Sequence, residues 1–105
     1  MSVFDDRQDA FEKKFAHDAE LQFKVQARRN KLLGLWAAGL LGKSGAEADK
    51  YAADVVKSDF EEAGDEDVFR KVFGDLGPVA DEPTIRGKMD TLMAEARAQV
   101  MSEPD

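Results

Sequence analysis

Hydrophobic residues recur at intervals of three and four along most of this chain, which is the spacing of one face of an α-helix. No segment shows the alternation of apolar and polar residues that marks a half-buried strand. The pattern predicts four helices, near residues 20–41, 45–63, 66–76 and 82–101. Because each has one apolar face and the loops are short, residues 20–105 are expected to form an all-α four-helix bundle. Its predicted apolar positions are Leu21, Val25, Leu32, Trp36, Leu40, Ala48, Tyr51, Ala52, Val55, Val56, Phe60, Val68, Phe69, Val72, Phe73, Leu76, Ile85, Met89, Leu92, Met93, Ala96 and Val100.

The predicted helix ends carry matching capping residues. Ser44 followed by Glu47 has the spacing of a capping box, and Asp65 and Asp81 are good N-cap residues for the last two helices. Gly64 and the pair at 77–78, Gly-Pro, are expected to end the second and third helices.

Residues 1–19, hereafter the N-terminal segment, have a different pattern. Phe4, Phe11 and Phe15 form a narrow stripe, while most other positions are charged. Such a stripe cannot form a core by itself, and a lone helix of this length is marginal in water. We expect the N-terminal segment to be flexible when free and to fold as a helix when a hydrophobic groove binds its rings. The alternative is that the rings fold back and complete the core of the bundle.

Charge divides the chain into three blocks. The chain has a net charge of −7, yet residues 21–43 contain five basic side chains and no acidic one. An internal role for this basic helix, lying among acidic helices, is favoured over a polyanion site, and the negative surroundings argue against nucleic-acid binding. Arg29 projects into the apolar stripe, where its stem is expected to pack beside Trp36 with a solvated head; the alternative is a carboxylate from a neighbouring helix.

Motifs of enzyme chemistry are absent from the sequence. There is no phosphate-binding glycine loop, no nucleophile with a base, no cysteine, and one histidine, His17. The acidic residues between 59 and 67 lack the spacing of a calcium loop. We therefore expect no enzyme activity, no metal and no cofactor. The longest apolar run, 32–42, is too short to span a bilayer, and no secretory signal begins the chain, so a cytoplasmic protein is expected. The free protein is expected to be a monomer.

Four long runs carry a resemblance to a known family. They are residues 4–7, 11–18, 27–38 and 59–68. In their order and their residues, these runs resemble the zeta subunit of the alphaproteobacterial F-type ATP synthase, over nearly the whole chain. The sequence departs from that family at 74–82, Gly39 and Gly87, which affects expected helix stability more than function.

The resemblance implies a regulatory inhibitor of ATP hydrolysis, held at the inner membrane through the ATP synthase. The N-terminal segment would wedge as a helix into an alpha/beta catalytic interface near the gamma subunit and block rotation. The family motif places partner contacts at Phe4, Asp5, Asp6, Arg7, Phe11, Glu12, Lys13, Lys14 and Phe15. Secondary predictions are a weak anion or nucleotide contact at Arg28, Arg29 and Lys31, and a pH-sensitive role for His17. The alternative function is a helical adapter that binds through the bundle.

Overall fold

The computed structural model describes residues 3–59 and 65–103, with side chains from residue 19 onward. The described chain is helical: α1 spans Val3–Leu40, α2 Ala46–Ser58, α3 Glu66–Leu76 and α4 Glu82–Ser102, with a short 3-10 turn, η1, at Gly77–Val79. The all-α, four-helix prediction is therefore confirmed. The molecule is elongated, with principal extents of 62 × 25 × 21 Å.

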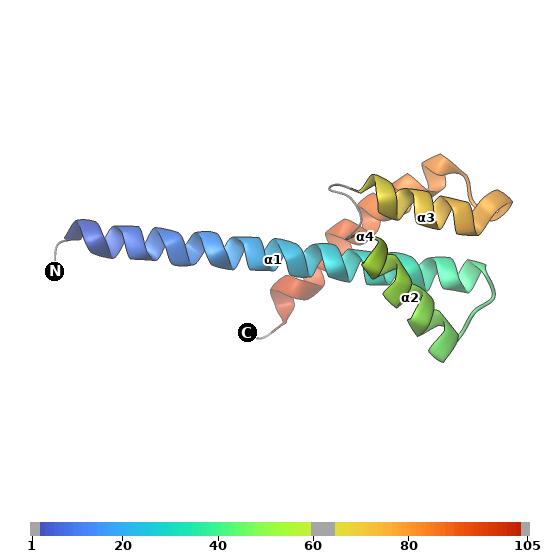
Figure 1. The fold of residues 1–105 in the computed structure, drawn as a ribbon, viewed down its shortest axis with the longest axis horizontal. Coiled ribbons are helices and arrows are strands. Elements are labelled where there is room, and N and C mark those ends of the chain that lie inside the picture. Colours follow the sequence, from blue (N-terminus) through green and yellow to red (C-terminus); the bar gives the residue numbers. More distant parts are fainter. Residues whose placement is uncertain (1–2, 60–64, 104–105) are drawn as a thin grey trace.

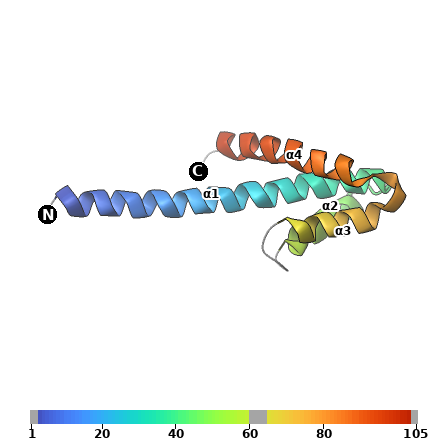
Figure 2. The ribbon, with the colours of Figure 1, turned by 90° about the horizontal axis from the view of Figure 1, so that it is seen from above.

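Helix α1 is the axis on which the other helices assemble. Figure 2 shows α4 along one side of α1, with α2 and α3 on the other. In both ribbon views the N-terminal half of α1 runs beyond the other helices (Figure 1). The bundle is thus built around the C-terminal half of α1.

The expected start of the first helix, near residue 20, differs from the structure. The backbone is helical from Val3, so the N-terminal segment and the first bundle helix form one continuous element. The physical reason is visible in the sequence, because residues 1–33 contain neither glycine nor proline. Without a helix breaker, each further turn adds to an existing helix and avoids the cost of nucleating a new one.

The main core lies between the C-terminal half of α1 and the other three helices. It contains Leu33, Ala37, Tyr51, Val55, Val68, Phe69, Val72, Leu76, Ile85, Met89 and Leu92. A smaller cluster of Val25, Ala96 and Val100 joins α1 to the C-terminal half of α4. Most predicted core positions of α2, α3 and α4 are buried, whereas Phe60 lies outside the described residues.

The buried face of α1 is rotated relative to the predicted stripe. Leu33 and Ala37 are fully buried, whereas Leu40 is exposed and Trp36 is partly buried. The sequence pattern missed this because α1 is covered from more than one side. Phe73, predicted to face the core, is also exposed, and its ring stacks on that of Phe69.

The expected caps agree with the structure at one helix. Asp81 accepts a hydrogen bond from the Thr84 backbone N–H at 3.0 Å and caps α4. The Ser44–Glu47 capping box is wrong: Gly45, at φ 58°, is the N-cap of α2 and gives no side-chain bond. Asp65 precedes α3 without a side-chain capping bond.

The C-terminal ends of α2 and α3 can be compared with the predicted ones. Helix α2 ends at Ser58, and its expected extension over 60–63 lies outside the described residues. Helix α3 ends at Leu76 as predicted, because Gly77 adopts the positive φ that stops a helix.

Candidate functional site

The predicted partner-binding positions all lie on the N-terminal half of α1. They are Phe4, Asp5, Asp6, Arg7, Phe11, Glu12, Lys13, Lys14 and Phe15, with His17 on the same helix. Their backbone is helical, and their side chains lie outside the described residues. Positions 4, 11 and 15 are seven and four apart, so a continuous helix brings them to one face. Their contacts stay a prediction.

A buried arginine fixes α1 to the start of α3. Arg29 is 1% exposed, and its Nη2 donates to Asp65 Oδ1 at 2.8 Å. Its Nε donates to Asn30 Oδ1 at 2.7 Å, and Asn30 is itself buried. The expected solvated head of Arg29 is therefore wrong, and the carboxylate alternative is correct. Asp65 is used as the ion-pair partner, which explains why it does not cap α3.

A second carboxylate lies against this arginine. Burial raises the pKa of Asp59 above its ordinary value; the Asp67 and Asp65 carboxylates act in the same direction, while the Asn30 amide and Arg29 guanidinium oppose the rise. The polar cluster around Arg29 therefore holds more acidic than basic charge. Arg29 itself is enclosed by the fold rather than offered to a ligand.

The three residues predicted to contact an anion do not form one site. Arg29 faces the interior, whereas Arg28 donates from Nη1 to Gln99 Oε1 at 2.9 Å and forms an ion pair with Glu103 beyond α4. Lys31 is exposed. The structure brings Arg28 and Lys31 to the same surface hollow and places Arg29 elsewhere. A nucleotide contact at these residues stays a prediction, with Arg28 and Lys31 as its accessible members.

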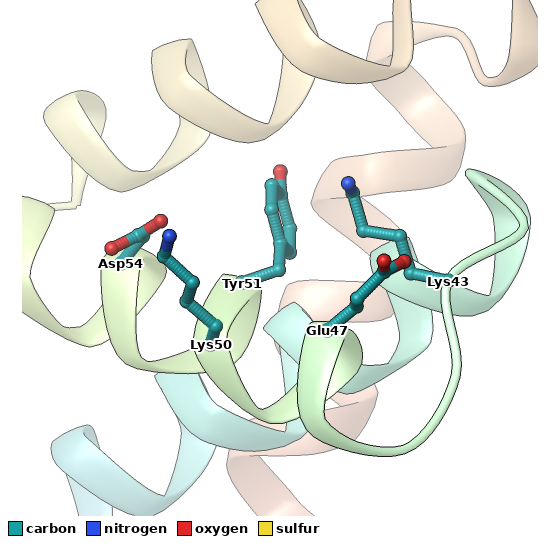
Figure 3. Close-up of a pocket in the computed structure, with 5 residues that line it drawn as sticks. All are labelled: Lys43, Glu47, Lys50, Tyr51 and Asp54. Atoms are coloured by element: carbon teal, nitrogen blue, oxygen red, sulfur yellow. The ribbon is translucent and has the colours of Figure 1, made fainter.

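A surface pocket of about 330 Å³ lies at the start of α2 (Figure 3). Lys43, Glu47, Lys50, Tyr51 and Asp54 line it. The Tyr51 hydroxyl donates to Asp75 Oδ2 at 2.8 Å, and burial, followed by this bond to a carboxylate, raises the tyrosine pKa above its ordinary value. With two lysines and two carboxylates around a protonated phenol, the pocket favours neither sign of ligand charge.

Residues that sequence reasoning did not single out hold α3 and α4 together. Arg86 donates to Glu66 through both Nη atoms, each at 3.2 Å, and to Glu82 at 3.0 Å. Its guanidinium carbon lies 3.9 Å from the centre of the Phe69 ring. The spacing of Glu82 and Arg86 at i, i+4 was the available signal, but the partner on α3 was set by tertiary packing.

Among the described side chains, no group of three or more histidines or carboxylates is arranged to hold a metal ion. None of the described helices is both long and apolar enough to cross a membrane.

Comparison with known proteins identifies the family. A protein whose structure was determined by solution NMR is 62% identical to this chain, with a TM-score of 0.75; the match covers 80% of this chain and 99% of that one. No curated protein sequence matches. The family model for the ATPase inhibitor subunit zeta matches residues 1–99, which includes both the N-terminal half of α1 and nearly all of the bundle. The chain therefore belongs to the family of ATPase inhibitor zeta subunits.

Proposed function

We propose that this protein inhibits ATP hydrolysis by the F-type ATP synthase by inserting the N-terminal half of α1 into an alpha/beta catalytic interface. The inserted helix lies near the gamma subunit and blocks rotation, while the bundle stays outside. The observation that supports this most is the continuity of α1, whose C-terminal half is enclosed by the bundle and whose N-terminal half runs out of it. The partners are the alpha, beta and gamma subunits of the catalytic head.

The continuous helix makes such an insertion energetically accessible. Nucleating a helix fixes several residues for one hydrogen bond, whereas extending an existing helix gains one bond for each residue fixed. Residues 25–38 are already held by the core, so the N-terminal segment can order by extension alone. We expect its first turns to fray when free and to become fixed on binding.

The apolar and the charged residues of the N-terminal segment have different roles. Phe4, Phe11 and Phe15 are the apolar anchors, because buried aromatic side chains carry much of the energy of protein interfaces. The charged positions between them set register and choice of partner. The mechanism is a wedge, with no covalent step.

The location of the protein follows from this partner. Bound to the catalytic head, it lies in the cytoplasm and is peripheral to the inner membrane through the ATP synthase. His17 lies at the junction between the wedge and the bundle, where protonation under mild acid would change the charge of the helix. Replacing His17 with Ala is therefore expected to weaken the pH dependence of inhibition.

The experiment is a titration of ATP hydrolysis by an alphaproteobacterial F-type ATPase stripped of its own inhibitor. The Phe11→Ala, Phe15→Ala double variant is expected to lose at least tenfold in potency, since each substitution removes an interface anchor worth about 1 kcal/mol or more. Its thermal unfolding should match that of the wild type, because the described buried core residues lie within 33–92 and 25–100. Equal potency of the two proteins would contradict the wedge.

A further inference from the structure

A shallow surface hollow follows α1, with Val56 of α2 and Glu103, the residue just after α4, among its lining. Its two parts measure about 500 and about 410 Å³, and Lys31 and Val56 line both. The two parts adjoin at these residues, and we name them together the basic trough. It begins at Phe23, four positions beyond the N-terminal segment on the same helix.

The floor of the basic trough is apolar. Phe23 is 58% exposed, although it is a large aromatic side chain. Ala27 on α1 and Ala52, Ala53 and Val56 on α2 continue the apolar surface along the trough. Exposed apolar surface that continues from one helix to the next is typical of a binding face rather than of a solvated one.

The rim of the basic trough is positively charged. Lys24, Lys31 and Lys57 are exposed, and among the described residues none of them forms an ion pair. Among the described residues, the acidic side chains in the lining are Glu103, which is already paired with Arg28, and Asp49 at one end. This surface is locally basic on a protein whose net charge is −7.

We propose that the basic trough is a second contact surface, which docks an acidic amphipathic helix of the ATPase catalytic head beside the inserted wedge. This inference rests on the proposed function. Two features favour the partner's chemistry: the lysine rim matches carboxylates, and the apolar floor matches one face of a helix. Phe23 and Lys31 are eight positions apart, about 12 Å along α1, a length that a little more than two turns of a partner helix covers.

The position of the trough explains what the second contact does. Because its first residue lies on α1 just beyond residue 19, a partner that encloses the wedge is directly adjacent to the trough. The lysine rim steers the bundle toward the acidic surface and fixes its orientation, so the trough acts on affinity and association rate. The wedge determines whether rotation stops.

The test compares full-length variants in binding to, and inhibition of, the stripped ATPase. Lys24→Glu combined with Lys31→Glu reverses the rim, and Lys50→Glu combined with Arg97→Glu makes the same charge change at exposed positions outside the trough. We expect the rim variant to bind about tenfold more weakly, with a smaller dependence on salt, and to inhibit fully at saturation. The control pair is expected to change affinity less than about twofold.

Phe23→Ala provides an independent arm that leaves charge unchanged. It is expected to weaken binding about fivefold, through loss of an aromatic contact, with the same salt dependence as the wild type. Circular dichroism of each variant checks that the helices are intact.

Three outcomes would overturn the trough. The first is equal affinity of the rim and control pairs. The second is loss of self-association in the rim variant with unchanged ATPase binding, which would assign the trough to a second copy of this chain. The third is a loss of ATP or ADP binding with unchanged ATPase binding, which would assign it to a small anion. If instead the rim variant weakens binding while the Phe11→Ala, Phe15→Ala variant inhibits normally, the trough stands and the wedge fails.

Discussion

The two halves of α1 share one backbone but differ in what holds them. In the C-terminal half, Arg29, Leu33 and Ala37 are buried by neighbouring helices. The N-terminal half extends past those helices, and its apolar stripe is spaced for a face that the bundle does not cover (Figures 1 and 2). Under the proposed function, one helix is a structural element at one end and the inhibitory element at the other. Substitutions in the C-terminal half should change stability, and those in the N-terminal half should change inhibition.

The largest stability effect is expected at the buried arginine. Arg29→Ala leaves a cavity and removes the cation that faces Asp65 and Asn30, so the free energy of unfolding should fall by about 3 kcal/mol. Asp65 is partly solvated, which keeps the loss at the lower end of the range for buried ion pairs. Urea unfolding measures the change.

The neighbouring arginine is the matched control. Arg28→Ala removes a partly exposed pair with Glu103 and should cost less than about 1 kcal/mol. A similar loss for the two variants would mean that Arg29 is not the enclosed residue described here.

A smaller effect is expected where α1 and α2 lie close together at Gly34. A Cβ placed on Gly34 would lie 2.6 Å from the Ala52 Cα, which is backbone that cannot rotate away. Gly34→Ala should therefore destabilise the bundle by about 2 kcal/mol, because the helices must separate. At Gly39, on the same helix, a Cβ meets nothing within 4 Å. Gly39→Ala should stabilise by up to about 1 kcal/mol through helix propensity, and thermal unfolding of the pair would distinguish them.

The smallest effect is a pH dependence. The pKa of Asp59 is raised in the folded protein, so the folded state holds this proton at pH values where the unfolded chain has released it. Its contribution to stability is therefore present at low pH and is lost as pH rises through the folded pKa. Asp59→Asn should stabilise the protein at pH 7 and have little effect near pH 3. Denaturant unfolding at the two pH values measures this, and equal effects at both would contradict the assignment.

Regular features of the fold could be predicted from the sequence because they depend on local spacing. The apolar positions of α4, from Ile85 to Val100, and its cap at Asp81 require no knowledge of other helices. The partner of Arg29 could not be predicted, because Asp65 lies 36 positions away and meets it through tertiary packing. The rotation of the buried face toward Leu33 has the same origin.

One feature that was not predicted, the continuation of the first helix through residue 20, could have been read from the local sequence. The absence of glycine and proline before Gly34 predicts a helix that continues through residue 20, and the continuous α1 follows from it. The basic trough could be predicted only in part. Residues 21–43, which contain Lys24 and Lys31 and no acidic side chain, can be recognised in the sequence, whereas the apolar floor depends on the placement of α2 beside Phe23.

The measurement that tests the division of α1 most directly is inhibition of the stripped ATPase by the full-length chain and by a version lacking residues 1–19. We expect the full-length chain to inhibit, and the shortened one not to inhibit even at concentrations where it occupies the enzyme. Equal inhibition by both would make the bundle the inhibitory element and contradict the proposed role of the N-terminal segment. Inhibition by neither, with both still bound, would favour a helical adapter that acts through the bundle.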